Sequence, residues 1–163
     1  MQQGLVLDCT AHYLNLAEQL LERRFAPVDV RFDLAGGSAG MFMLKGRECL
    51  IRYNPWLFSK YFTENLEGTV PHEVAHYIVH RTHGMRRTRP HGPEWKAVMA
   101  GFDADDSVTS DFDLQGIPQR RQRRYAYRCL CMDHELSARR HNTIASGKGR
   151  YQCRKCDGEL FPA

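Results

Sequence analysis

Residues 70–83 read VPHEVAHYIVHRTH, and this segment predicts the central helix of the chain. Thr69 could cap its beginning, Pro71 suits the first turn of a helix, and Gly84 could close its end. Apolar side chains recur along the segment at helical spacing and would pack on the rest of the molecule. The other elements are therefore interpreted around this helix.

The pattern His-Glu-x-x-His within this helix combines two metal ligands with a general base. His72 and His76 stand four residues apart, so their imidazoles lie on one helix face and can point at one ion. Glu73 lies about 100° further round the helix, where its longer side chain can reach a metal-bound water. Zinc lowers the pKa of bound water from ~15.7 to about 7, and Glu73 would accept the proton.

A catalytic zinc site needs three protein ligands and one open position, so a third ligand is required. His80 lies on the same helix about 6 Å beyond His76, and three ligands in a row on a straight helix cannot surround one ion. His83 is followed at once by Gly84. His91 comes after a loop that can fold back, so it can approach from a third direction. The sequence favours His91, with His80 and His83 as alternatives.

Four of the six cysteines form two tight pairs near the C-terminus. The pairs are Cys129 with Cys131, and Cys153 with Cys156. Two pairs of thiolates are typical of a zinc ribbon, a closed site that folds a segment with little apolar content. His134 or His141 could replace one cysteine. We therefore expect a structural metal site in this region.

The segments around the central helix predict a domain of mixed α and β structure. Helices are expected over residues 11–25, with Thr10 as the cap, and over 55–65 and 93–101; strands are expected over 28–34, 41–44 and 49–53. Residues 103–113 are acidic, lack helical periodicity and predict a connector. We expect an α+β core over residues 8–118, with a small antiparallel sheet packed on helices, followed by a zinc-ribbon-like subdomain over 119–163.

The composition limits the classes to which the chain can belong. Hydrophobic residues make up 42% and charged residues 26% of 163, which suits a globular protein and argues against wholesale disorder. No window approaches the ~18 unbroken apolar residues of a membrane span. The first residues, MQQGLVLDC, lack the features of a secretory signal. We expect a cytoplasmic protein without a membrane partner, and the sequence carries no sign of its oligomeric state.

Charge is distributed unevenly along the chain. Residues 1–80 carry 7 Lys and Arg against 9 Asp and Glu, whereas residues 81–163 carry 16 against 10. A basic half can face DNA, single-stranded or at a junction, and Tyr125 and Tyr127 could stack on its bases. The arginines nearest to the motifs are Arg86, Arg87, Arg89, Arg120, Arg121, Arg123 and Arg124. A solvated basic surface would account for the same charges.

Three segments together resemble the SprT family, whose eukaryotic relatives include the Spartan DNA-dependent metalloproteases. They are VPHEVAHYIVH (70–80), PHGPEWK (90–96) and a pattern from YRC-x-C through RRHN to Y-x-C-x-x-C-x-G-x-L (127–160). The resemblance implies a zincin-like core of the minigluzincin type, with zinc on His72, His76 and His91 and Glu73 as the base. It also implies a small zinc-binding subdomain on Cys129, Cys131, Cys153 and Cys156. The Spartan relatives cleave proteins crosslinked to DNA.

The sequence thus predicts a zinc metallopeptidase with one catalytic and one structural Zn²⁺. It would hydrolyse peptide bonds of protein substrates, including proteins associated with DNA, by means of a metal-activated water. The alternative is a nucleic-acid-associated zinc-binding module without significant proteolytic turnover. The uneven charge and the cysteine ribbon are the features that favour this alternative.

Overall fold

A computed structural model of the chain describes residues 2–84, 88–107, 111–119 and 123–163. The chain divides into two compact units, residues 1–119 and 120–163, and each has a hydrophobic core of its own. The arginines at 86, 87, 120 and 121, which we considered for DNA contacts, lie outside the described residues. No helix in the described part of the chain is long and apolar enough to cross a membrane.

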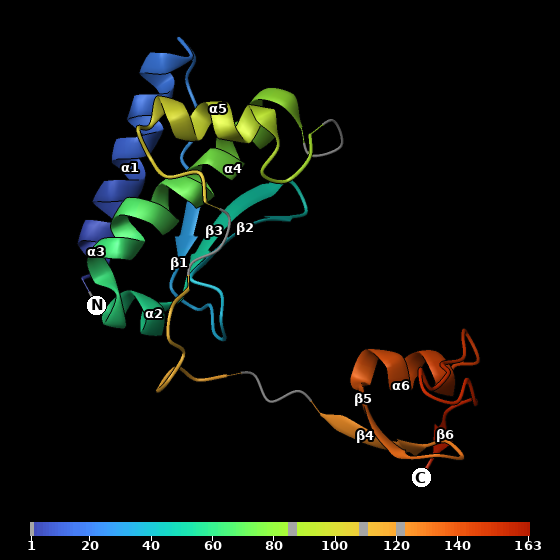
Figure 1. Ribbon diagram of the computed structural model, residues 1–163. Coiled ribbons are helices and arrows are strands. Elements are labelled where there is room, and N and C mark those ends of the chain that lie inside the picture. The colour runs from blue at the N-terminus through green and yellow to red at the C-terminus, as the bar shows by residue number, and fades with distance from the viewer. Residues whose placement is uncertain (1, 85–87, 108–110, 120–122) are drawn as a thin grey trace. The chain divides into compact units, whose positions relative to one another are not determined.

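The first unit contains helices and a three-stranded sheet, with helix α4 in the middle (Figure 1). The helices are α1 (Gln3–Leu20), α2 (Pro55–Lys60), α3 (Phe62–Glu64), the π-helix η1 (Asn65–Thr69), α4 (Val70–His83) and α5 (Pro93–Gly101). The strands are β1 (Asp29–Arg31), β2 (Gly40–Lys45) and β3 (Glu48–Tyr53). Helix α4 contacts α1, α5, β2 and β3. The predictions of helices over 70–83 and 93–101 are confirmed.

The sheet of the first unit has the strand order β1-β3-β2 and is mixed. Strands β2 and β3 form an antiparallel hairpin, as expected for this sheet, with Gly46 at φ 65° in the turn. Strand β1 runs parallel to β3, so the expectation of an antiparallel sheet is wrong for this pair. Alternation of side chains indicates which face is buried and does not indicate strand direction.

Helix α1 begins at Gln3, well before the predicted start at residue 11, and ends at Leu20. Thr10 is therefore inside the helix and is not its cap. Its hydroxyl group donates to the Val6 carbonyl (2.8 Å) and lies 3.2 Å from the Tyr53 hydroxyl. The hydroxyl is thus used in buried contacts and does not cap a helix. The early end follows from Glu22, whose φ is 48°, a left-handed conformation that stops a helix.

The helix predicted over 55–65 is instead divided into α2, α3 and η1, and η1 runs directly into α4. Thr69, the predicted cap of α4, is itself helical and donates its hydroxyl to Asn65 Oδ1 (2.7 Å). Asn65 is fully buried and donates to the carbonyls of Tyr61 (2.6 Å) and Leu57 (3.2 Å). These bonds satisfy the buried amide within the wider π turn, a feature frequent at functional sites.

The second unit consists of strands and one helix around a small core. Strand β4 (Arg124–Arg128) pairs with β5 (Asp133–Ser137) and β6 (Phe161–Pro162), and α6 (Ala138–Ala145) follows β5 directly. The sequence did not predict α6. Residues 151–153, which resemble a strand in sequence, contribute one isolated bridge between Gln152 and Glu159.

Asn54 provides a test of how the first unit is held together. Its Oδ1 accepts the N–H groups of Trp56 (3.1 Å) and Leu57 (3.4 Å), which caps α2. Its Nδ2 donates to the carbonyls of Gly36 (2.9 Å) and Ser38 (3.1 Å).

We expect Asn54→Ala to lower the free energy of unfolding by about 2–4 kcal/mol, because a helix cap and the donor to two carbonyls are lost. Urea denaturation followed by circular dichroism measures this change. Asn15→Ala, on the exposed side of α1, is the matched control and should change stability little. Equal midpoints for the two variants would contradict the role of Asn54.

Candidate metal centre

Three histidine rings of the first unit converge on one point. His72 and His76 lie on adjacent turns of α4, and His91 lies just before α5. Their Nε2 atoms are 3.2 Å apart between His72 and His76, 3.0 Å between His76 and His91, and 3.0 Å between His72 and His91. The structure thus brings together the three histidines that the sequence favoured.

The spacing of these nitrogens suits a single tetrahedral metal ion. Zinc holds histidine nitrogens at about 2.0–2.1 Å, which places neighbouring ligands about 3.3 Å from one another. The observed separations of 3.0–3.2 Å agree with this value to within a few tenths of an ångström. Together the three residues form a group whose ligand atoms could hold a metal ion such as zinc.

Burial keeps the imidazoles neutral and therefore able to donate a lone pair. It lowers the pKa of His72 to about 4, with a smaller contribution from His91. It lowers the pKa of His76 to about 3, assisted by His72 and His91. Burial also lowers the pKa of His91. At neutral pH the rings do not have to lose a proton before they bind a cation.

His91 reaches the site because the chain reverses just before α5. Its φ is 55°, an uncommon left-handed conformation for a residue with a side chain, and Gly92 N–H donates to the Arg89 carbonyl (3.0 Å). The alternatives stay outside the group: the His80 ring packs on Phe42, at 5.8 Å between centroids, and is not among the converging ligand atoms. His83 is exposed at the end of α4.

Trp95 forms the wall behind the histidines, a role that the sequence did not assign. The side chain is 1% exposed, and its ring centroid lies 4.8 Å from those of His72 and His91 and 5.7 Å from that of His76. Its Nε1–H donates to the His72 carbonyl (3.3 Å). The only feature of the sequence that could have indicated this role is the spacing of four residues between His91 and Trp95.

Glu73 lies next to the histidines and against strand β2. It is 6% exposed, and its Oε2 accepts the backbone N–H of Phe42 at 2.6 Å. Burial raises the pKa of Glu73 to about 7, although the Phe42 hydrogen bond opposes this shift. A carboxyl group with a pKa near neutrality can both accept and return a proton. A backbone donor such as Phe42 N–H has no signature in the sequence.

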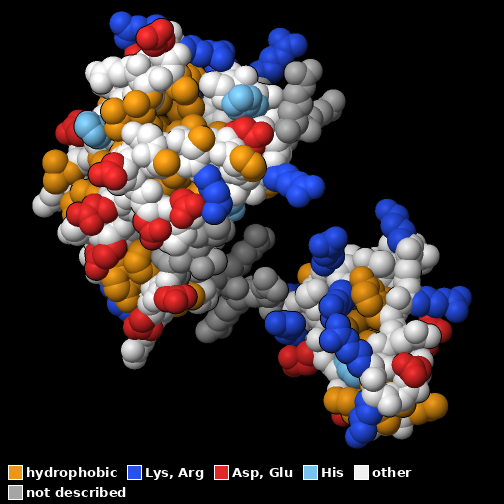
Figure 2. Space-filling view, turned by 45° about the horizontal axis from the view of Figure 1, so that its top comes forward, with side chains coloured by type: hydrophobic (Ala, Val, Ile, Leu, Met, Phe, Trp, Pro, Cys, Tyr) orange, Lys and Arg blue, Asp and Glu red, His pale blue; other side chains and the backbone are white. Residues whose placement is uncertain are grey.

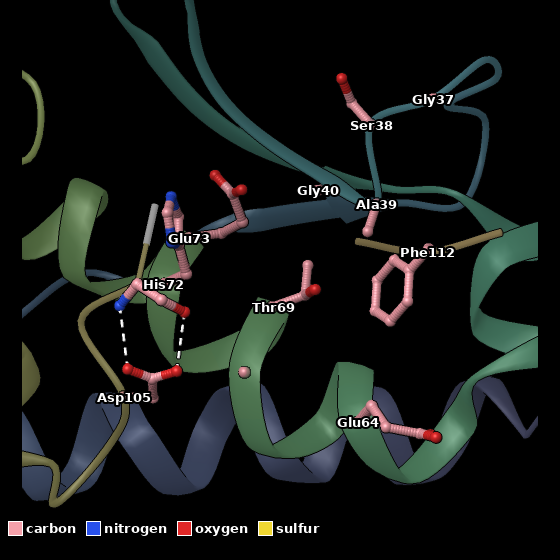
Figure 3. Close-up of a pocket in the computed structure, with 12 residues that line it drawn as sticks. Gly37, Ser38, Ala39, Gly40, Glu64, Thr69, His72, Glu73, Asp105 and Phe112 are labelled. Carbon is pink, nitrogen blue, oxygen red and sulfur yellow. Dashed lines mark hydrogen bonds between the residues drawn. The ribbon is translucent and has the colours of Figure 1, made fainter. Parts of the chain in front are cut away.

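Two cavities meet at His72 and Glu73. One, of about 320 Å³, is lined by small and polar residues that include Gly40 and Thr69 (Figure 3). The other, of about 330 Å³, is largely apolar and is lined by Met41, Phe42, Val79 and Trp95, among others. Glu73 and the histidines are therefore open to a molecule from two sides.

The four cysteines of the second unit also converge. The Sγ atoms of Cys129 and Cys131 are 3.4 Å apart, and the distances from Cys131 to Cys153 and from Cys129 to Cys156 are both 3.7 Å. Tetrahedral zinc with sulfur ligands at about 2.3 Å requires about 3.8 Å between sulfurs. The four thiols thus form a second group that could hold a metal ion.

The histidines near the cysteines are placed differently from the thiols. His134 Nε2 lies 3.3 Å from Cys129 Sγ and is outside the four-thiol group. Burial raises the pKa of the Cys129 thiol, but hydrogen bonds, including those from Cys131 N–H and His134, outweigh it and bring the pKa to about 5. His141 stacks on Tyr125 with 3.7 Å between centroids, away from the sulfurs.

The tyrosines proposed to stack on DNA bases are not both available. Tyr127 is 1% exposed, and its hydroxyl lies 3.1 Å from His141 Nδ1, so the hypothesis is wrong for this residue. Tyr125 is already stacked on His141, with 5° between the ring planes. The two tyrosines belong to the core of the second unit and its edge.

Comparison with known proteins agrees with this geometry. The model of the SprT-like family matches residues 10–113. Protein SprT of Pasteurella multocida (strain Pm70) is 39% identical over 149 residues, 91% of this chain and 86% of the relative. Protein SprT of Klebsiella pneumoniae subsp. pneumoniae is 37% identical over an alignment 164 residues long, which covers all of this chain and 93% of the relative. No solved structure matches the chain. The resemblance found in the sequence is thus confirmed, and the chain belongs to the SprT-like family.

Proposed function

We propose that the chain is a zinc metallopeptidase that hydrolyses peptide bonds in protein substrates. The observation that carries this proposal is the convergence of three imidazoles, with Nε2 atoms 3.0–3.2 Å apart, beside a buried carboxyl group. His72, His76 and His91 would hold the ion. When bound, zinc would lower the pKa of a coordinated water and polarise the scissile carbonyl.

Glu73 is the general base in this proposal. One of its oxygens is held by Phe42 N–H, while no donor to Oε1 is found among the described residues. Oε1 can therefore take a proton from the attacking water. The protonated carboxyl group then passes that proton to the leaving amine.

The general-base role is tested by Glu73→Gln, which keeps the shape of the side chain and removes the basic oxygen. We expect cleavage of casein or histones to fall by about 10²–10⁴-fold while bound zinc is unchanged. Gel-based degradation, with a chelator-treated sample as the second control, measures the loss. A variant that cleaves as fast as the parent would show that another group accepts the proton.

We propose two zinc ions per chain, one at the histidines and one at the four cysteines. His91→Ala should remove about one equivalent and leave the second unit folded. Cys153→Ala should remove the other equivalent and destabilise the second unit, because metal binding contributes to the folding of such small domains. Elemental analysis of the purified protein counts the ions. One equivalent in the parent protein would eliminate one of the two sites.

We also propose that DNA binds the second unit and brings the peptidase to DNA-associated proteins. Residues 120–163 carry 11 Lys and Arg against 4 Asp and Glu, whereas residues 1–119 carry 12 against 15. Four thiolates with one divalent ion would carry a net charge of −2, which would still leave the unit strongly basic. Figure 2 shows basic side chains gathered on the visible face of this unit.

The DNA contact is tested with the double variant Arg139→Gln/Lys148→Gln, since both side chains are exposed in the second unit. Single-stranded DNA should bind the full chain less tightly, and the log–log dependence of binding on salt should lose about 0.7 per lost phosphate contact. Arg47→Gln, exposed in the turn between β2 and β3, is the control. Equal binding by both variants would contradict the assignment. DNA binding by a parent protein that cleaves nothing would favour the binding module instead.

A further inference from the structure

At Gly40, strand β2 leaves no room for a side chain between itself and Glu73 of helix α4. A Cβ atom at this position would lie 2.6 Å from Glu73 Cγ, 2.7 Å from Glu73 Oε1 and 2.7 Å from Thr69 Cγ2. Real Cβ atoms essentially never come within 3.0 Å of such neighbours. Gly40 is not among the glycines with positive φ, and it pairs regularly with Tyr53 of β3. The glycine is therefore required by space and not by backbone conformation.

The space left by Gly40 is filled by the carboxyl group of the proposed base. Two residues further along the same strand, the backbone N–H of Phe42 donates to Glu73 Oε2 at 2.6 Å. The absent side chain at position 40 and the amide at position 42 thus determine together where this carboxylate lies. Figure 3 shows Gly40 and Glu73 beside one another at the edge of the cavity.

Thr69 closes the same space from the helix side. It lies one turn before Glu73, and its hydroxyl is occupied by Asn65 Oδ1 at 2.7 Å. Its methyl group is the third atom that a Cβ at position 40 would meet, at 2.7 Å. Thr69 is thus fixed by a residue that is itself fully buried, so the space cannot widen readily on this side.

We propose that Gly40 is a positioning residue for Glu73: by lacking a side chain, it lets the carboxyl group lie against β2, with Oε2 on Phe42 N–H and Oε1 free for the attacking water. This inference rests on the proposed peptidase function for its catalytic meaning. A methyl group at position 40 displaces the flexible Glu73 side chain more easily than the backbone. Strand β2 is held by its hairpin with β3, and α4 is held by its buried face.

The test compares Gly40→Ala with Gly4→Ala in the full, zinc-loaded chain. Gly4 is exposed in the first turn of α1, it lines neither cavity of the site, and a Cβ there would meet nothing within 4 Å, so it is the control. We expect Gly40→Ala to lower kcat by about 10²-fold, the scale for a reacting group misplaced by 1 Å, with KM and bound zinc unchanged. Gly4→Ala should keep the parental kcat. Parental kcat in Gly40→Ala would overturn the inference.

A double-mutant cycle separates positioning from a general structural defect. If Gly40 acts only through Glu73, adding Gly40→Ala to Glu73→Gln should lower the residual activity no further. Additive losses would show that Gly40 acts through the fold as a whole. If Gly40→Ala lowers the Tm, the pair Gly40→Ala/Thr69→Ser removes the contact with the threonine methyl group and isolates the clash with Glu73.

Hydrogen exchange at Phe42 tests the inference independently of any activity. Phe42 N–H points away from β3 toward Glu73, so its protection depends on this carboxylate. We expect the Phe42 amide to exchange at least about tenfold faster in Gly40→Ala than in the parent or in Gly4→Ala. If the Phe42 amide exchanges at the parental rate in Gly40→Ala, the positioning role is overturned, whatever the activity of the variant. A parent protein with a protected Phe42 amide and no cleavage would instead overturn the proposed function alone.

Discussion

The burial of helix α4 on all but one side is the constraint on which the candidate metal centre depends. Val74, Ala75 and Ile78 are fully buried in the core, so the helix cannot rotate without losing these contacts. The remaining side of the helix carries His72 and His76 on successive turns. A ligand pair on a fixed helix has a fixed spacing, and the third ligand has only to be brought to it by the reversal of the chain before α5.

The same burial acts in opposite directions on the ligands and on the base. Removal from water disfavours a positive imidazolium, so the histidines remain neutral electron-pair donors. It also disfavours a negative carboxylate, so Glu73 holds its proton more tightly than an exposed glutamate. One environment therefore prepares two kinds of group for two different tasks. The balance is adjusted by a single backbone donor, Phe42 N–H, which opposes the effect of burial on Glu73.

Sequence reasoning succeeded where spacing along one element carries the information. The interval between His72 and His76 is local, and so are the bounds of α5 and the paired cysteines of the second unit. It failed where a distant contact decides the outcome. Thr10 has the chemistry of a helix cap, yet it lies inside α1, with its hydroxyl 3.2 Å from that of Tyr53. Tyr127 has the chemistry of a base-stacking residue, yet the second unit needs it as core. Gly40 is indistinguishable in sequence from a glycine in a turn, because the contact that requires a glycine there is with a helix more than 30 residues away.

Strand β2 lies at the border of its sheet, where backbone groups face outward without a neighbouring strand. Such a row of amides is a template on which another polypeptide can assemble into β-structure, including that of aggregates. The carboxylate of Glu73 takes the amide of Phe42 and interrupts this row at its middle. The group that we assign to proton transfer thereby also leaves one amide fewer on this edge for pairing with another chain.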